Sequence, residues 1–544
     1  MLIAAALGMA SLLSLLPAAG HDQIWFLLMA KRWLGGAVLY GPSLFDSNPP
    51  LIVWLSAIPV SLAQYLHLPP TSIGKLLTLL ALLLSANLSL RLLRHTAPLT
   101  RAQTLWLTFA AICIFTVVPA RDLGQRDHLT AILCLPYILA ATITRSDSSS
   151  TLTPTAPQTP PAPRLPLRIL IGLLAAIGIG LKPHQALIPI AVELTRILTI
   201  QFSPASLREP RWRLGLTEIL RPEPTTILLS SAAYLLLIHR YAPAYFTLAL
   251  PTLHDTYWAI GHLTPLHLLA EAPQLHLLAA ITLALVLTSR SRRPPAPAAL
   301  IHPEPLRRPI LLLLAAALAA TLAYYLQGTG WYYQQLPAIS LFAAALALHL
   351  LDYPAHLRIP TSPWLPRAIA AIAVLALALT AHFTSYPFTP DRAFAIFSPD
   401  PAFFRDLPPG TPIAILSTSV DDTMMPVARY HLLWAQRTNN LWTLPAILRS
   451  ENSAAPRHTI SPARLADLDR QQHAWMVEDL NQWQPRLVLV ARCQAPEVHC
   501  QELEDRHDNL LAWFNRDPAF RTLWQQSYRY LRTSGPYDAY TRTN

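Results

Sequence analysis

The residues best suited to chemistry in this chain are acids, cations and imidazoles that lie in short segments between long apolar runs. The segment ARDLGQRDH (residues 120–128) contains Arg121, Asp122, Arg126, Asp127 and His128. Ionisable groups near membrane depth are costly, and they usually line a substrate path or pair with one another. The segment is therefore a candidate binding site, and mutual pairing of each arginine with the aspartate that follows it is the alternative.

Two more acids bracket a polar segment near the start of the chain, at residues 21–50. Asp22 comes directly after the first apolar run, and Asp46 precedes a double proline. A carboxylate within hydrogen-bond reach of a reacting hydroxyl or amine can take its proton. Between the two acids, residues 22–34 combine apolar residues with Lys31 and Arg32, a pattern typical of a helix that lies in the headgroup region.

Two shorter segments add cations and aromatic rings. Lys182 and His184 stand at a predicted hairpin tip, and lysine otherwise occurs only at positions 31 and 75. Trp331 and Tyr332 follow a Gly-Thr-Gly turn. Their rings suit stacking on a sugar, with a place in the aromatic belt at the membrane surface as the alternative.

The elements that position these residues are predicted to be membrane-spanning helices. The chain of 544 residues is 53% hydrophobic and only 13% charged, against about 25% charged in an ordinary soluble protein. This composition excludes a soluble enzyme, a disordered chain and a fibrous repeat. Apolar runs near the length of a span lie at 2–20, 51–67, 76–93, 103–119, 128–143, 168–183, 184–200, 226–241, 274–289, 309–326, 335–351 and 367–385.

The distribution of Lys and Arg predicts the orientation, because cytoplasmic loops keep an excess of them. If residues 51–67 lie on the outer surface or re-enter, five basic loops fall on one side and hold 18 of the 25 basic residues before residue 387. We therefore expect about 11 crossings in the inner (plasma) membrane of a bacterium, with the N-terminus cytoplasmic. A cleaved signal peptide is the alternative for the first run, because Ala18-Ala19-Gly20 resembles a cleavage site.

The same distribution explains the net charge of +11 without nucleic acid as a partner. The segment before residue 387 has 25 basic and 13 acidic residues, whereas residues 387–544 have 16 and 17. The excess thus marks topology, and membrane lipids are the expected partners of the apolar helices.

Residues 387–544 lack apolar runs of spanning length and are predicted to form a small extracytoplasmic α/β domain. Strands are expected at 411–418 and 487–491, helices at 462–482 and 501–515, and a hairpin at 528–540. Asp421 and Asp422 are expected to form a turn, with a ligand loop as the alternative. The division predicted from the sequence is therefore 1–386 and 387–544.

The four cysteines divide between the two parts. Cys113 and Cys134 lie in apolar runs and are expected to be packing residues. Cys493 and Cys500 lie close together in the exported part, where disulfides persist, and we predict that they are bridged.

Four features together resemble the membrane glycosyltransferases of the GT-C superfamily, in the branch of dolichyl-phosphate-mannose and aminoarabinose transferases. They are the acid after the first span (Asp22), the Asp-x-x-Pro-Pro element at 46–50, the Arg/Asp segment that enters a span (121–128) and the Lys-Pro tip (182–183). The family usually has a paired acid in the first loop, whereas here Gln23 follows Asp22. The resemblance implies a polytopic helical fold with sugar transfer at the outer face.

The implied substrates are a polyprenyl-phosphate-linked sugar as donor and a lipid, exported glycan or protein as acceptor. Arg121, Arg126 and Lys182 are the available cations for the phosphate, because charge-assisted hydrogen bonds to phosphate are strong. Asp22 is our first choice for the base and Asp46 the second.

A divalent metal is an open alternative, because Asp22 and Asp127 each stand beside a histidine and both residue types are ordinary ligands. The ligand set is unknown and no cofactor is certain. A transporter or lipid flippase is the alternative function, although such proteins usually place their polar residues at the midplane, often in internal repeats. A non-catalytic scaffold is a third interpretation.

Overall fold

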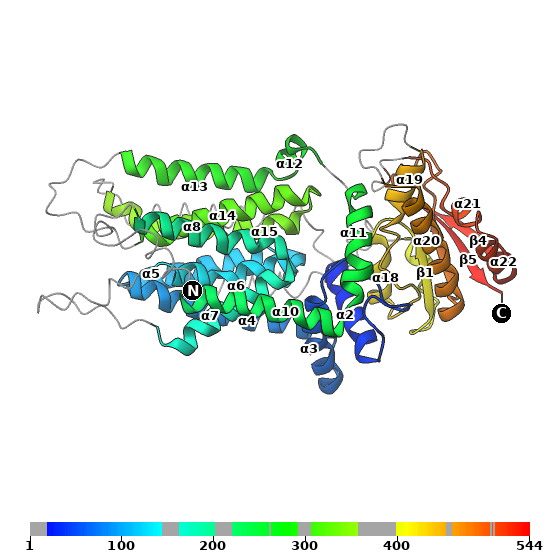
Figure 1. Ribbon diagram of the computed structural model, residues 1–544, viewed down its shortest axis with the longest axis horizontal. Helices are drawn as coiled ribbons and strands as arrows, with labels where there is room; N and C mark the ends of the chain where they lie inside the picture. The colour runs from blue at the N-terminus through cyan, green and yellow to red at the C-terminus, as the bar shows by residue number, and fades with distance from the viewer. Residues whose placement is uncertain are drawn as a thin grey trace, which may run out of the picture. The chain divides into compact units, whose positions relative to one another are not determined.

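The computed structural model describes residues 19–143, 163–201, 220–260, 263–291, 306–356, 399–452, 460–500, 503 and 506–543. Most of the chain is helical, and a small sheet lies near the C-terminus (Figure 1). The runs predicted to span at 2–20 and 367–385 fall almost entirely outside the described residues.

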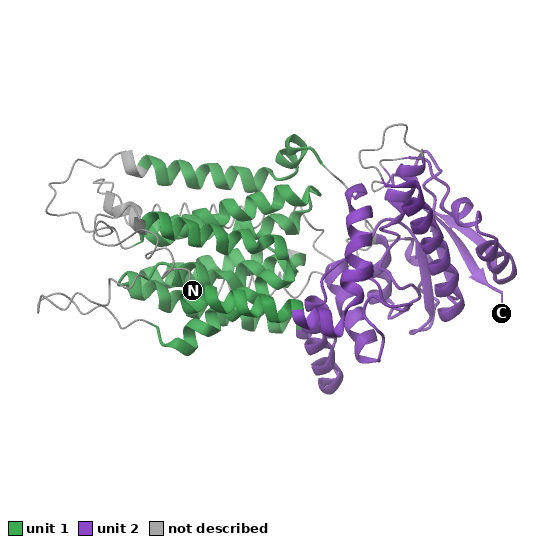
Figure 2. Ribbon diagram, viewed as in Figure 1, with its two compact units in different colours: residues 1–18, 74–235, 263–386 green, residues 19–73, 236–262, 387–544 purple. Residues whose placement is uncertain are grey.

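The chain divides into two compact units (Figure 2). Unit 1 comprises residues 1–18, 74–235 and 263–386, and unit 2 comprises residues 19–73, 236–262 and 387–544. Unit 2 thus joins two segments from the first part of the chain to the predicted C-terminal domain. The polar segment with Asp22 and Asp46 belongs to unit 2.

Unit 1 is built from apolar helices. Its described helices are α4 (Pro70–Thr96, with its first turn in unit 2), α5 (Arg101–Ile112), α6 (Arg126–Ala140), α7 (Leu165–Leu181), α8 (Leu187–Gln201), α10 (Pro222–Tyr241, with its last turns in unit 2), α12 (Pro265–Glu271), α13 (Pro273–Ser291), α14 (Arg307–Gln327) and α15 (Tyr332–His356). Within the described ranges, α4, α14 and α15 are long and apolar enough to cross a membrane, and the number is up to five if each of two sharply bent helix pairs is counted as one span. Helices α5 and α7 of unit 1 and α3 (Leu51–Leu66) of unit 2 are apolar but shorter.

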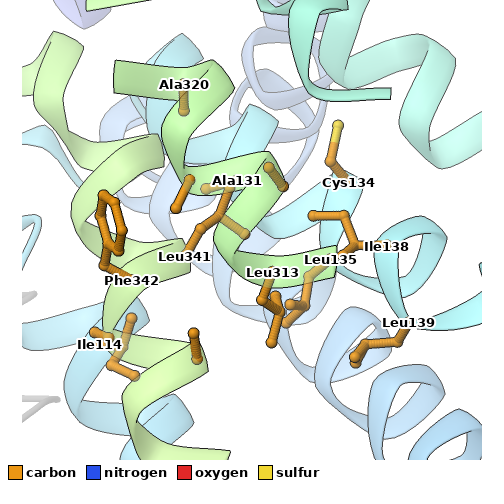
Figure 3. Close-up of a cluster of buried hydrophobic side chains, with 14 of the residues drawn as sticks. Ile114, Ala131, Cys134, Leu135, Ile138, Leu139, Leu313, Ala320, Leu341 and Phe342 are labelled. Atoms are coloured by element: carbon orange, nitrogen blue, oxygen red, sulfur yellow. The ribbon is translucent and has the colours of Figure 1, made fainter. Parts of the chain in front are cut away.

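The core of unit 1 lies between α6, α14 and α15 (Figure 3). Small side chains at Ala316, Ala317 and Ala320 of α14 are fully buried, and such residues let helix backbones approach closely in membranes. Cys113 and Cys134 are buried free thiols within this core, which confirms their predicted packing role.

Local sequence explains several helix boundaries of unit 1. Thr100 and Gln103 form a capping box at the start of α5. Helix α14 ends at Gly328, whose backbone is left-handed with a φ of 69°, a conformation that glycine adopts without a steric penalty. The chain then turns through Thr329 and Gly330 into α15.

Unit 2 contains helices α2 (His21–Leu34) and α3 (Leu51–Leu66), the segment from η6 (Tyr245–Ala249) through α11 (Leu250–Thr256), and a five-stranded sheet. Helix α2 confirms the helix predicted at 22–34. Helix α3 contains Pro59 in its interior. It corresponds to the apolar run at 51–67, predicted to lie on the outer surface or to re-enter.

The sheet has the order β2-β1-β3-β5-β4. Strand β1 (Pro412–Leu416) pairs in parallel with β2 (Leu433–Trp434) and β3 (Leu487–Ala491), and Ile413 stands opposite Leu487. Strands β4 (Tyr528–Ser534) and β5 (Tyr537–Arg542) form an antiparallel hairpin, with β5 next to β3. Both predicted strands and the predicted hairpin are therefore confirmed, and so is the α/β character of this part.

Helices of the C-terminal part agree with the sequence in one case and depart from it in two. Helix α20 (Pro462–Trp483), capped by Ser461, confirms the helix predicted at 462–482. The helix predicted at 501–515 is wrong in extent, because Asn509 caps α21, which covers only Leu510–Phe514. The turn predicted at 421–422 is instead the start of α18 (Asp421–Arg429).

A disulfide joins Cys493 and Cys500, which confirms the bridge predicted from the sequence. The bridge closes the loop that follows β3.

One group of buried charges in unit 1 forms a network between its helices. Arg221 lies 2.5 Å from Glu193 of α8 and 3.9 Å from Glu223 of α10, and Arg168 of α7 donates two hydrogen bonds to Glu223 at 2.6 and 2.8 Å. The hydroxyl of Tyr137 donates to Glu193 at 2.6 Å. These contacts tie four helices together through groups that are expensive to leave unpaired.

We expect Arg221→Met to destabilise the protein strongly, because it leaves the carboxylate of Glu193 without the arginine that neutralises it, while Glu223 keeps its contact with Arg168. Breaking a buried ion pair by removing one partner costs about 3–5 kcal/mol. Thermal unfolding of the detergent-purified protein would show a midpoint several degrees lower. The control Arg91→Met removes an exposed arginine of α4, and equal midpoints for the two variants would contradict the assignment.

Candidate functional site

Several predicted site residues of unit 1 lie close together at the ends of its helices. The start of α6 brings Asp127, the tip between α7 and α8 brings Lys182, and the turn between α14 and α15 brings Gln327. The ammonium of Lys182 lies 3.2 Å from the carboxylate of Asp127 and donates a hydrogen bond of 3.3 Å to the side chain of Gln327. Lys182 thus contacts Gln327, which lies 145 positions later in the chain, as well as Asp127.

The buried carboxylate of Asp127 has a second contact on its other oxygen. The side-chain amide of Gln185 donates to Oδ1 of Asp127 at 3.3 Å, while Lys182 faces Oδ2. Asp127 is completely buried and Lys182 almost so. A buried charge of either sign is costly when alone, so each of these groups depends on the other.

Local backbone structure explains why Lys182 points into this cluster. Helix α7 ends at Leu181, and Lys182 has an extended conformation with φ −143° and ψ 90°. Pro183 then begins a short 3₁₀ turn, η4 (Pro183–Ala186), that leads into α8. The Nζ atom of Lys182 also lies 5.4 Å from the ring centre of Tyr333, and this distance permits a cation–π contact.

The arginine and aspartate of η2 (Ala120–Asp122) form a looser pair beside this cluster. The Nε of Arg121 lies 3.9 Å from Asp122, and Arg121 keeps a fifth of its side chain exposed. Tyr332 lies within electrostatic range of Asp122 and donates its hydroxyl to the carbonyl of Val118 at 2.8 Å. Tyr332 therefore connects the start of α15 to this segment.

Neither nitrogen of the His128 ring is open in this arrangement. The amide of Gly124 donates to Nδ1 at 3.0 Å, and Nε2 lies 3.0 Å from the carbonyl of Phe115. His128 therefore links the start of α6 to the segment before it. A metal ligand needs a free ring nitrogen, so the pair of Asp127 and His128 predicted as possible ligands does not fit a metal here.

His184 and Gln185 present buried polar atoms to the same cluster. Nε2 of His184 and Oε1 of Gln185 have no hydrogen-bond partner in the structure. His184 lies within electrostatic range of Lys182, Asp127 and Arg126. Buried polar atoms are nearly always satisfied, and unsatisfied ones gathered beside an ion pair are typical of a binding site.

The aromatic residues after the Gly-Thr-Gly turn have different settings. Trp331 is exposed over more than a third of its surface, whereas Tyr333 is buried. The two rings lie 5.7 Å apart between centres. Trp331 is thus the exposed ring next to the cluster, and Tyr332 is held by its hydroxyl.

The two acids of the first polar segment belong to unit 2 and have separate surroundings. Asp22 is in the first turn of α2, with the ring of His21 at 3.4 Å. Asp46 is buried in the loop before α3, where the backbone amide of Ser47 donates to it at 2.7 Å and Asn48 Nδ2 donates at 3.2 Å. Asp46 is therefore held by its near neighbours in the chain.

No cluster of three or more His, Cys, Asp or Glu residues with a geometry for a metal is found within the ranges that the structure describes.

Sequence reasoning did not single out Gln185 and Gln327 as parts of the cluster. Each stands within three residues of a feature that it did recognise, namely the Lys-Pro tip or the Gly-Thr-Gly turn. Polar residues directly beside such turns are the signal that would have found them.

Comparisons with known proteins identify the fold. No family model matches the chain, and no curated protein matches it in sequence. ArnT from Cupriavidus metallidurans in the apo state, an aminoarabinose transferase, is similar in structure, with a TM-score of 0.51 and 11% identity over 99% of this chain and 96% of that chain.

A second similar structure is the archaeal oligosaccharyltransferase AglB from Archaeoglobus fulgidus, in complex with an inhibitory peptide and a dolichol-phosphate. Its TM-score is 0.45 with 12% identity, over 100% of this chain and 74% of that chain. Both neighbours are GT-C membrane glycosyltransferases. The predicted resemblance is therefore confirmed as a resemblance of fold, which rests on ArnT, and the fold is that of a multi-pass membrane protein.

A double-mutant cycle on Asp127 and Lys182 tests the ion pair at the centre of the cluster. We expect Asp127→Asn and Lys182→Met each to destabilise the protein, and the double variant to lose less than the sum. Residues in direct contact typically couple by about 0.5–3 kcal/mol. The measurement is thermal unfolding in detergent.

The exposed pair Asp467 and Arg470 of α20 provides the control, because exposed ion pairs contribute about 0–1 kcal/mol. Strictly additive effects at Asp127 and Lys182 would show that the pair is not energetically coupled.

Proposed function

We propose that this protein is a membrane glycosyltransferase that moves a sugar from a polyprenyl-phosphate donor to a lipid, exported glycan or protein acceptor at the outer face. The observation that carries the proposal is the buried cluster around Lys182 in a chain with the fold of ArnT. In support of the orientation, the cluster lies at the ends of α7 and α14 that are away from the basic loops. The proposed location is the inner membrane, with about 11 crossings, the N-terminus cytoplasmic and the C-terminal domain outside.

The charge of the cluster suits a phosphate. Within the cluster, Arg126 and Lys182 contribute two positive charges and Asp127 one negative charge. The adjoining pair of Arg121 and Asp122 adds no net charge. The cluster thus carries one net positive charge, which a phosphodiester would neutralise. In a water-poor setting fixed positive charge also stabilises the phosphate as it leaves, and electrostatic stabilisation of this kind often contributes more to catalysis than any other effect.

The proposed reaction is a displacement at the anomeric carbon of the sugar. A carboxylate takes the proton of the acceptor hydroxyl or amine, and the acceptor atom forms a bond to that carbon. The bond between the carbon and the phosphate oxygen breaks, and its electron pair leaves with the polyprenyl phosphate. Asp22 remains our first choice for the base and Asp46 the second.

Substitution of the two acids tests the reaction. In a deletion strain that carries the chain as its only copy, we expect Asp22→Asn or Asp46→Asn to lower sugar transfer by about 10²–10⁴-fold, the usual contribution of a general base. Mass spectrometry of envelope glycans and polyprenyl-linked sugars would show a product lost and a donor accumulated.

Asp255→Asn is the matched control, because this acid of unit 2 pairs with Arg464 at 2.7 Å. If every variant leaves glycans and lipid-linked sugars unchanged while the protein accumulates normally, glycosyl transfer is not its function. A donor lipid that merely changes sides of the membrane would favour a flippase.

Binding of polyprenyl phosphate tests the role of the cluster directly. We expect Lys182→Met to weaken binding of this lipid to the purified protein by about tenfold or more, because a charge-assisted hydrogen bond contributes about 1.5–3 kcal/mol. Lys31→Met removes an exposed lysine of α2 and is expected to leave binding unchanged. Equal affinities for wild type and both variants would contradict the assignment.

A further inference from the structure

The loop that carries Asp46 is held by the C-terminal domain within unit 2. The loop connects α2 to α3 and therefore covers residues 35–50. Arg32, in the last turn of α2, and Phe45, within the loop, contact residues 434–483. None of these contacts involves a group that the proposed reaction uses.

Arg32 near the end of α2 makes the first contact. Its guanidinium donates to the carbonyls of Gln436 at 2.7 Å, of Ser43 at 3.2 Å and of Trp434, and it lies 4.8 Å from the ring centre of Trp483. Burial lowers the pKa of Arg32 to about 10, so the group is charged at neutral pH. One planar fork of donors thus fixes the loop, at Ser43, against the end of β2.

Phe45 makes the second contact, directly before Asp46. Its backbone amide donates to the carbonyl of Arg437 at 2.8 Å. Its buried ring lies parallel to Trp442, with 6.0 Å between centres, and tilted against Trp475 at 4.6 Å. Aromatic pairs of this kind add about 0.5–1.5 kcal/mol beyond the area that they bury.

Arg437, whose carbonyl accepts the hydrogen bond from Phe45, has ionic partners of its own. Arg437 binds Asp479 through Nε at 2.8 Å and through its backbone amide at 2.9 Å, and binds Glu478 at 2.7 Å. Burial raises the pKa of Asp479 to about 6 against the opposing effect of Arg437, which leaves the carboxylate ionised at neutral pH. The anchor on the C-terminal domain is therefore rigid.

The orientation of Asp46 depends on the same loop. Its carboxylate accepts hydrogen bonds from its near neighbours Ser47 and Asn48, and the hydroxyl of Tyr40 donates to the carbonyl of Asn48 at 2.6 Å. The ring of Tyr40 lies 5.3 Å from that of Tyr245. A shift of the loop would therefore carry the carboxylate with it.

We propose that the C-terminal domain positions Asp46, the second of the two candidate bases, for proton transfer, with Arg32 and Phe45 as the positioning residues. The inference rests on the proposed function and gives the soluble domain a task in it. A displacement of about 1 Å at a reacting group can cost about 10²-fold in rate. The domain would thus affect turnover without contributing a group that touches the donor phosphate.

The test compares Arg32→Met, Arg32→Lys and Phe45→Leu with wild type in the full-length protein. We expect hydrogen–deuterium exchange of residues 35–50 to rise at least tenfold in Arg32→Met and Phe45→Leu, and sugar transfer in the deletion strain to fall by about 10²-fold. Binding of polyprenyl phosphate should stay within about twofold of wild type, since the assigned cations are in unit 1. Arg32→Lys keeps the positive charge but loses the planar set of donors. We expect its rate of sugar transfer to lie between those of wild type and Arg32→Met.

Arg464→Met is the matched control, because Arg464 of unit 2 binds Asp255 and not the loop; its exchange and transfer should match wild type. Unchanged exchange in both Arg32→Met and Phe45→Leu, or a mobile loop with normal transfer, overturns the positioning role. Transfer that stays normal even in Asp22→Asn and Asp46→Asn overturns the proposed function instead, whatever the exchange shows. Lost binding of polyprenyl phosphate in Arg32→Met would also contradict the inference, because it would indicate general unfolding.

Discussion

The cost of leaving a charge buried without a partner governs the polar architecture of this protein. In unit 1, Lys182 and Asp127 neutralise each other between the ends of distant helices, and Arg221 does the same for two glutamates. In unit 2, Arg437 binds Asp479 within the sheet-bearing part. The two pairs of unit 1 join helices that apolar packing alone would hold less firmly, because in a membrane the lipid competes with helix–helix packing.

The same constraint gives the candidate site its character. A lysine that must be paired is held at a defined point, and the aspartate that pairs with it reduces the positive charge without removing it. The cluster keeps an excess of cations and presents unsatisfied atoms at His184 and Gln185. Such a site is organised before a ligand arrives, so little of the binding free energy is lost in arranging it.

Unit 2 shows a second use of fixed polar contacts. Arg32 has carbonyl oxygens as its hydrogen-bond partners, and it therefore joins chain segments about 400 positions apart without fixing a second charge. These contacts hold the loop that carries Asp46. The sheet-bearing part at the end of the chain thus becomes part of the setting of an acid near its beginning.

The sequence by itself determined the membrane class, the helix at 22–34, the strand at 487–491 and the bridge between Cys493 and Cys500, because periodicity, apolar length and local spacing are properties of neighbouring residues. It also identified Lys182 and Asp127 as unusual. Only the tertiary structure decided that these two meet, that Gln327 joins them, and that α21 begins as late as Leu510. Contacts between distant segments depend on how the helices pack, and no local pattern encodes that packing.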